Sequence, residues 1–174
     1  TISQFVNPNK RKKKLLGELY DFPEKTMAIG RLDVASEGLL LLTTDGKVSA
    51  FIRSQKVAKE YYVQVDGIIT NDAVEKLKTG VEIGFDGKKY MTKPCESFLL
   101  ETPDFPNRSQ KIRDERHGPT SWVSITVREG KFRQVRKMTA AVGFPTLRLV
   151  RVRIGTILLK GLAVGEVKEV ADLL

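Results

Sequence analysis

One stretch limits the possible folds of this chain more than any other: residues 30–43, which read GRLDVASEGLLLLT. The run Leu39–Leu42 is short and continuously apolar, which predicts a strand buried on both faces. Gly30 and Gly38 bracket the residues ahead of that run and indicate a tight turn. The stretch therefore presents one carboxylate, Asp33, at the entrance of a buried strand, where a reactive group can be held in a fixed position.

The composition is that of a basic globular protein. A length of 174 residues is enough for a substantial core in one domain or in two closely packed lobes. The formal net charge of +9 indicates a polyanionic partner such as RNA, because Lys and Arg side chains attract phosphates from a distance. No stretch approaches the roughly 20 apolar residues of a membrane span, and the chain does not open on a signal peptide. We therefore expect a cytoplasmic protein without a membrane partner.

The single cysteine and the single histidine restrict the available chemistry. Cys95 and His117 cannot form a disulfide, a zinc site of the usual ligand count, or a pair of catalytic imidazoles. Neither a phosphate-binding loop nor a dinucleotide-binding glycine pattern is present, so we expect no metal and no nucleotide cofactor. The remaining groups for chemistry are carboxylate, arginine, tyrosine and hydroxyl.

Hydrophobic periodicity predicts an α+β domain with a mixed, mainly antiparallel sheet and flanking helices. The predicted strands cover residues 59–66, 121–127 and 146–154, with a bulge between Leu149 and Val150 in the last of them. The predicted helices follow the basic run 10–14, cover residues 47–53, open at Thr70 and end at Gly80, and run from Phe132 to Gly143. Asp86-Gly87 predicts a hairpin, and residues 102–119 predict a long surface loop.

Two residues are candidates for a reactive centre. Asp33, taken alone, would more often be a turn former that hydrogen-bonds its own backbone. Tyr61 shares the apolar face of its predicted strand with Val63 and Val65, which is typical of a core tyrosine. Its ring could instead stack on a nucleobase. Tyr62 takes that place if the strand is rotated.

Basic residues dominate the segment from residue 128 to residue 153. Its eight basic residues are Arg128, Lys131, Arg133, Arg136, Lys137, Arg148, Arg151 and Arg153, and its one acid is Glu129. A solvated face normally mixes charges of both signs, so this imbalance favours an RNA-binding surface. Arg133 and Lys137 lie four residues apart on a predicted helix, so they should share a side and face phosphate together.

Three separated segments resemble the pseudouridine synthases of the RsuA/RluB/RluE/RluF family. Residues 30–43 resemble the family's Gly-Arg-Leu-Asp signature, with Ser36 where Thr is usual, and residues 59–65 resemble its Lys-x-Tyr-x-Val-x-Val pattern. Residues 129–138, EGKFRQVRKM, resemble a third signature, Glu-Gly-(Arg/Lys)-x-Arg-Gln-Val-Arg-Arg-Met. Further similarity over residues 61–67, 119–122 and 143–149 favours the RluE branch of the family.

The resemblance implies an activity and a set of acting residues. It implies isomerisation of a specific uridine in ribosomal RNA, most simply the 23S RNA of the large subunit, by a monomer that needs no cofactor. The partner would be ribosomal RNA or a ribosome precursor, and residues 1–174 would form a single catalytic domain without the S4-type RNA-binding module of related enzymes. Asp33 would be catalytic, with Arg136 as its basic partner. The substrate-binding residues would be Arg31, Tyr61, Arg133, Arg136 and Lys137.

Two other functions remain open at this point. The same chemistry could act on 16S ribosomal RNA, and a non-catalytic factor for ribosomal RNA binding or assembly would show the same basic surface. A nuclease or a glycosidase is disfavoured, because glycosidases generally use two placed carboxylates and nucleases often use metal clusters.

Overall fold

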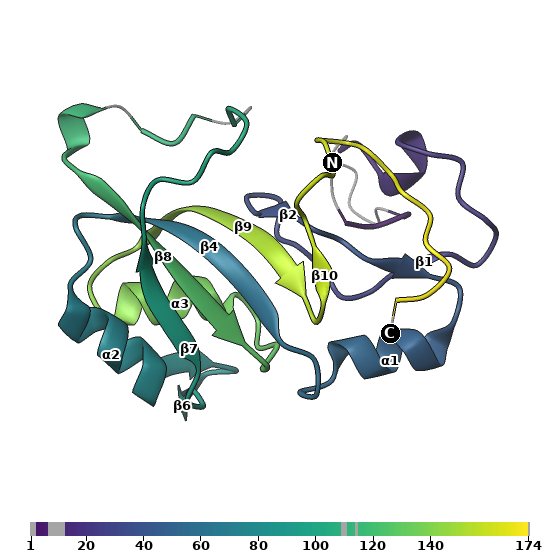
Figure 1. Ribbon diagram of the computed structural model, residues 1–174. Helices are drawn as coiled ribbons and strands as arrows, with labels where there is room; N and C mark the ends of the chain where they lie inside the picture. Colours follow the sequence, from purple (N-terminus) through teal and green to yellow (C-terminus); the bar gives the residue numbers. More distant parts are fainter. Residues whose placement is uncertain (1–2, 7–12, 109–110, 114, 174) are drawn as a thin grey trace.

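The computed structural model describes residues 3–6, 13–108, 111–113 and 115–173, and it has an α+β fold with a mainly antiparallel sheet (Figure 1). The strands are β1 (Met27–Ala28), β2 (Glu37–Gly38), β3 (Leu42–Thr43), β4 (Lys59–Asp66), β5 (Glu82–Phe85), β6 (Lys88–Met91), β7 (Glu96–Leu100), β8 (Thr120–Val127), β9 (Thr146–Ile154) and β10 (Ile157–Leu158). The helices are α1 (Gly46–Arg53), α2 (Asn71–Thr79), α3 (Gln134–Ala141) and the 3-10 turns η1 (Leu16–Glu18) and η2 (Glu115–His117). The main sheet has the order β10-β9-β4-β8-β7, and β2 joins it in parallel beside β9. The predicted fold class is confirmed.

The three long strands form where alternating polarity predicted them, and they carry the main core. Val63 of β4 lies between Val123 of β8 and Leu149 of β9, and all three are buried. Side chains of α2 and α3, including Leu77 and Met138, pack on this same face. The core therefore lies between one face of the sheet and these two helices.

The irregular points of β9 differ from the prediction. Its register with β4 is continuous at Leu149 and Val150, and shifts instead at Leu147 and Val152, which have no partner on β4. The predicted bulge between Leu149 and Val150 was wrong. Four consecutive residues in the middle of β9 are buried. The change in polarity that suggested a bulge reflects burial on both faces.

The predicted strand over the leucine run, Leu39–Leu42, was wrong, because only Leu42 of these residues lies in a strand. β2 ends at Gly38 beside β9, and β3 begins only at Leu42 beside β1. Between them Leu39 and Leu41 are buried, as predicted, while the backbone crosses from one sheet to the other. Gly38 has a φ of +107°, and a Cβ there would lie 2.3 Å from the carbonyl oxygen of Arg151, so this crossing requires glycine.

The elements with local capping signals form as predicted. The carboxylate of Asp45 accepts a hydrogen bond from the backbone at the start of α1, the hydroxyl of Thr70 does so for α2, and Gly80 follows the end of α2. Asp86 and Gly87 both have positive φ and join β5 to β6 as a hairpin. These short-range signals depend on neighbouring residues alone, which is why they could be interpreted from sequence.

The predicted N-terminal helix is wrong in the part that can be described. Only the single turn η1 forms after the basic run, and Lys13 and Lys14 are exposed beside it. The other three residues of that run, 10–12, lie outside the described residues. A short segment of this kind gains little from helical propensity alone.

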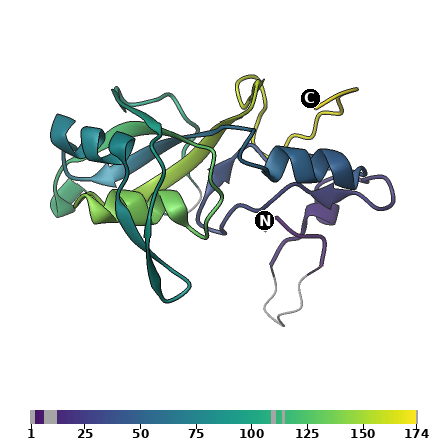
Figure 2. The ribbon, with the colours of Figure 1, turned by 90° about the horizontal axis from the view of Figure 1, so that it is seen from below.

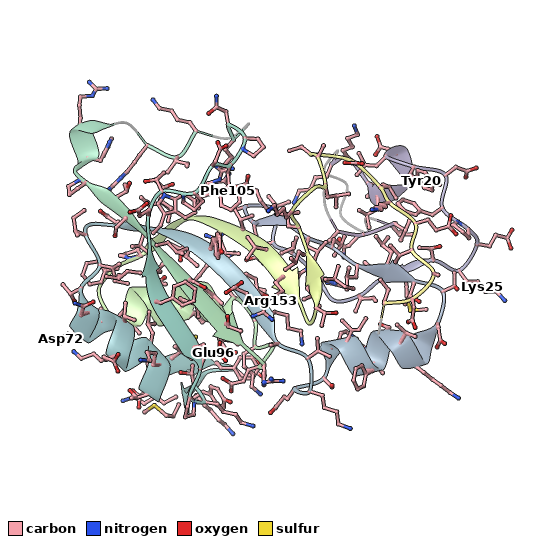
Figure 3. The ribbon with its side chains drawn as sticks, viewed as in Figure 1. Tyr20, Lys25, Asp72, Glu96, Phe105 and Arg153 are labelled. Atoms are coloured by element: carbon pink, nitrogen blue, oxygen red, sulfur yellow. The ribbon has the colours of Figure 1, made fainter. Side chains whose placement is uncertain are left out.

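The long loop between β7 and β8 covers the second face of the sheet. Phe105 packs against Tyr62 and Trp122, with ring centroids 6.1 and 5.7 Å apart (Figure 3). Near the other end of the loop, Arg113 forms an ion pair with Asp66 at 2.7 Å. The loop is irregular, as predicted, but it is anchored to the sheet at several points.

A second, smaller core lies against one side of α1, and α1 is separated from α2 and α3 (Figure 2). Its buried members are Ile29, Leu39, Leu41, Ile52, Val57 and Ile154. It joins the leucine run to the end of β9, and through Ile29 and Leu39 it supports the segment that carries Asp33. Within the described ranges, no helix is long and apolar enough to cross a membrane.

Candidate active site

A cleft of about 380 Å³ lies between the segment 29–36, the paired strands β4 and β9, and the residues that lead into α3. Its acidic lining residues are Asp33 and Glu129. Its basic lining residues are Arg31, Arg53, Lys59, Lys131, Arg133, Arg136 and Arg151. This excess of positive charge suits an anionic ligand.

Asp33 begins a tight turn at the edge of the cleft. The backbone N–H of Ser36 donates to the carbonyl oxygen of Asp33 at 2.8 Å, which closes the turn. The Asp33 Oδ2 atom lies 2.8 Å from Arg133 Nη1 and 3.6 Å from Arg136 Nε. Two guanidinium groups therefore fix the direction of a carboxylate that is only 28% exposed.

The side chain of Arg136 also binds the backbone of this turn. Its Nη2 donates to the carbonyl oxygen of Ala35 at 3.1 Å. Burial, followed by the charge of Arg133, lowers the pKa of Arg136 from its ordinary value, while Asp33 acts in the opposite direction. An arginine nevertheless stays protonated in proteins. Its Nε is buried and has no hydrogen-bond partner among the described residues, so a donor remains beside Asp33.

Arg133, which contacts Asp33, has a left-handed backbone. Its φ is +53° at the position just before α3, so the helix starts later than predicted. Lys137, one turn further on, donates instead to the carbonyl oxygen of Gly84 at 2.7 Å and does not line the cleft. The prediction that Arg133 and Lys137 share a side was wrong, because only Lys137 is helical. Phe132 is 67% exposed and does not join the buried face of the helix.

Tyr61 and Arg31 also line the cleft. Tyr61 packs against the main core and presents part of its ring to the cleft, whereas Tyr62 points to the opposite face and packs against Phe105. In the observed register of β4, Tyr61 and not Tyr62 lines the cleft, as the sequence pattern predicted. Arg31 is exposed, two residues before Asp33.

Comparison with known proteins identifies the family. The family model described as RNA pseudouridylate synthase matches residues 4–141. The chain belongs to this family. Ribosomal large subunit pseudouridine synthase E of Vibrio parahaemolyticus is 43% identical over 98% of this chain and 69% of its own length. The protein of the same name from Xanthomonas axonopodis is 40% identical over 93% of this chain and 84% of its own length.

A solved structure gives the same result for the fold. A crystal structure of a pseudouridylate synthase matches with a TM-score of 0.68 and 29% identity over 84% of this chain. This chain spans a little more than half, 56%, of that protein. The predicted pseudouridine synthase family and its RluE branch are thus confirmed.

The long loop is a second support for the Asp33 turn of this pseudouridine synthase. Arg108 donates from Nη2 to the carbonyl oxygen of Ala35 at 2.6 Å, and its Nε lies 3.4 Å from Glu37 Oε2. Glu37 is also held by two contacts with Arg148, at 2.8 and 2.9 Å. No sequence pattern singled out Arg108 or Glu37, because their contacts join segments about 70 to 110 residues apart.

Glu129 shapes the segment that leads into α3. Its carboxylate accepts hydrogen bonds from the Tyr90 hydroxyl, from the backbone N–H of Lys93 at 3.0 Å and from Gln134 Nε2 at 2.8 Å. Burial raises the pKa of Glu129, but these hydrogen bonds more than offset it, so the net pKa is below its ordinary value. Glu129 therefore joins the β5–β6 hairpin to the segment that carries Arg133.

The basic residues between 128 and 153 do not form one RNA-binding surface. Arg148 and Arg151 are only 9% and 5% exposed. Arg153 pairs with Glu60 at 3.5 Å on the face of the sheet away from α3 (Figure 3). The predicted RNA-binding surface therefore cannot include all eight of these residues, because strand alternation sends the side chains of β9 to both faces of the sheet.

The cysteine and the other metal-binding side chains contribute no further site. Burial raises the pKa of the Cys95 thiol to about 11, so the thiol stays protonated at neutral pH. Among the residues that the structure describes, no group of three or more His, Cys, Asp and Glu side chains could hold a metal ion.

Proposed function

We propose that this protein converts one uridine of large-subunit ribosomal RNA to pseudouridine, with Asp33 as the catalytic residue. The bond between uracil N1 and ribose C1′ breaks, the base turns, and C1′ is joined to C5. The base is both leaving group and incoming nucleophile, so the reaction needs no cofactor. Family membership supports the reaction, and the names of the relatives from Vibrio and Xanthomonas favour 23S over 16S RNA as the substrate.

One observation carries this proposal: the carboxylate of Asp33 lies in the cleft, 2.8 Å from Arg133 and 3.6 Å from Arg136, with Tyr61 in the same lining. A fixed carboxylate of this kind suits attack on the ribose, attack on the ring and removal of a proton alike. Arg133 and Arg136 orient it in each of these roles.

The target nucleotide has to leave its stack to enter the cleft, which costs a few kcal/mol. We assign the compensating contact to Tyr61, since stacking of a base on an aromatic ring contributes about 1–3 kcal/mol. Arg31, exposed near Asp33, is assigned to the flipped nucleotide. Lys137 lies outside the cleft lining, so we assign it to phosphates of the flanking RNA.

We further propose that the protein acts as a monomer in the cytoplasm, on ribosomal RNA or on a ribosome precursor. Asp33, Arg133, Arg136, Tyr61 and Arg31 line one cleft, so the proposed chemistry needs no residue of a second subunit. Ribosomal RNA of bacteria is made and modified in the cytoplasm, and the relatives are bacterial.

Tritium release from RNA labelled at uracil C5 tests the proposal. The wild type should release tritium from 23S transcripts, and Asp33→Asn should abolish release while RNA affinity stays nearly unchanged. The matched control is Asp66→Asn, since Asp66 pairs with Arg113 and neither residue lines the cleft. A wild type that binds ribosomal RNA without any tritium release would favour the non-catalytic assembly factor instead.

A further inference from the structure

Arg151 lines the cleft, and one of its buried hydrogen-bond donors has no acceptor among the described residues. The residue is only 5% exposed, and its Nε donates to the carbonyl oxygen of Leu39 at 2.8 Å, which fixes the guanidinium. Its Nη2 has no hydrogen-bond partner among the described residues. A buried polar group that lacks a partner is costly, so an acceptor from a ligand would stabilise this arrangement.

Lys59 lies beside Arg151 in the same lining and is also partly buried. Its Nζ donates to the carbonyl oxygen of Ser54 at 3.1 Å. Burial, followed by the charges of Arg151 and Arg128, lowers the pKa of Lys59 to about 8. Two cations that repel each other in a half-buried site favour a ligand with negative charge.

The acids of the cleft do not supply that charge. The ion pairs within the described part of the chain include neither Lys59 nor Arg151. Asp33 is already paired with two other arginines. Glu129 accepts three hydrogen bonds from other partners. A carbonyl oxygen of the substrate can therefore serve as the acceptor for Arg151.

The sheet register places this donor next to the ring of Tyr61. Tyr61 on β4 and Arg151 on β9 are direct cross-strand partners, so their side chains stand side by side on one face. Lys59 lies two residues before Tyr61 and therefore points to the same face. A base stacked on the ring of Tyr61 would therefore lie on the same face of the sheet as the Arg151 side chain.

We propose that Arg151 donates a hydrogen bond from Nη2 to a carbonyl oxygen of the flipped uracil, and that Arg151 and Lys59 stabilise the negative charge of the detached base. This inference rests on the proposed isomerisation. When N1–C1′ breaks, its electron pair stays on the ring and spreads over N1, O2 and O4. C5 then gives an electron pair to C1′, the C5 proton leaves, and N1 takes up a proton. Preorganised cations act most strongly where charge develops in this way.

The arrangement also favours uracil over cytosine. An arginine has donors only, so it pairs with carbonyl oxygens. Uracil presents O2 and O4, whereas cytosine carries an amino group in place of O4. Arg151 is therefore assigned to recognition of the base as well as to stabilisation of its charge.

Substitution of Lys59 tests the electrostatic part. Lys59→Met should lower kcat about a hundredfold, as loss of one preorganised donor does elsewhere, with RNA affinity little changed. Lys59→Arg should restore most of the rate. Lys56→Met is the matched control, because Lys56 is exposed on the same connection and does not line the cleft.

The pH dependence of kcat/KM shows whether Lys59 acts through its charge or only through its packing. Lys59 faces Arg151, Arg128 and the carbonyl oxygen of Ser54, and it loses its proton near pH 8. The wild-type kcat/KM should therefore fall above pH 8, since this parameter reports ionisations of the free enzyme. Lys59→Arg should keep its rate there, because its guanidinium stays protonated.

Sulfur substitution in the RNA tests the Arg151 contact. RNA with 2-thiouridine or 4-thiouridine at the target position offers a weaker acceptor at one carbonyl position. One of the two should react about tenfold more slowly with the wild type, in keeping with a lost hydrogen bond to a charged donor. Arg151→Gln should be slow with normal RNA and should show no further slowing with that substrate.

The outcomes separate this inference from the proposed function. If Lys59→Met behaves like Lys56→Met and both thio-substituted RNAs react at the normal rate, the inference is overturned while the proposed function stands. If the wild type forms no pseudouridine at all, the proposed function is overturned instead. Should Arg151→Gln fail to fold, the Lys59 variants and the thio-substituted RNAs with the wild type still decide.

Discussion

Two segments of the molecule hold the Asp33 turn, and they differ in what they touch. The segment leading into α3 contacts both the turn and the reacting group, because Arg136 binds the carbonyl oxygen of Ala35 and lies 3.6 Å from the Asp33 carboxylate. The long loop contacts the turn through Arg108, 2.6 Å from the same carbonyl oxygen. The segment leading into α3 therefore orients the carboxylate directly, whereas the long loop supports only its backbone. Loss of the first contact should lower kcat more than loss of the second.

The largest effect is expected on the α3 side. Arg136→Ala should lower kcat by about a hundredfold or more, because a catalytic group displaced by about 1 Å costs that much. Arg133→Ala should cost less, since Arg136 would still hold the turn. Initial rates of tritium release at saturating RNA measure both. A rate for Arg136→Ala close to that of the wild type would contradict direct orientation of Asp33.

A smaller effect is expected in the long loop. Arg108→Ala should lower kcat about tenfold with KM and the thermal midpoint nearly unchanged, because the turn loses one of two anchors. Arg113→Ala is the control in the same loop, since Arg113 pairs with Asp66 and not with the turn. Equal losses of kcat in Arg108→Ala and Arg113→Ala would mean that any weakening of the loop lowers activity. Arg108 would then have no specific role in supporting the Asp33 turn.

The double variant Arg108→Ala/Arg136→Ala measures whether the two anchors depend on each other. Both arginines donate to the carbonyl oxygen of Ala35, so their effects should not add. Groups that share a partner typically couple by about 0.5–3 kcal/mol. Purely additive losses in kcat would show that each anchor acts separately.

The smallest effect concerns RNA binding rather than the turn. Arg31 is exposed at the cleft, so Arg31→Ala should weaken RNA affinity a few-fold and reduce the salt dependence by about 0.7 in slope, the value for one phosphate of a single strand. Arg108 is nearly buried and should leave that slope unchanged. Titrations at several salt concentrations measure both, and a changed slope for Arg108→Ala would assign the loop to RNA instead.

The same contrast explains which features were predictable from sequence. Asp45, Thr70 and the Asp86-Gly87 turn act on neighbouring residues, so the elements they begin or join could be predicted. Asp33, Tyr61 and Arg136 stand in recognisable patterns, and the structure brings all three to one cleft.

Features that depend on the packed structure could not be predicted. The left-handed backbone of Arg133 lies next to Gln134, whose side chain donates a hydrogen bond to Glu129. Such a contact forms only in the folded protein. Arg108 and Glu37 meet only because the long loop crosses the sheet. Arg148 is buried in an ion pair with Glu37, which is distant in the sequence. The charge composition of residues 128–153 therefore placed Arg148 on the surface, although it is internal.

Catalysis depends on the position of the Asp33 carboxylate, and the variant Asp33→Glu measures this dependence. This change keeps the charge and the arginine partners but moves the carboxylate by one methylene group. RNA affinity should stay normal while tritium release falls by about a hundredfold or more, because the carboxylate no longer occupies its fixed position. Activity within a few-fold of the wild type would contradict the account, since charge alone would then be sufficient.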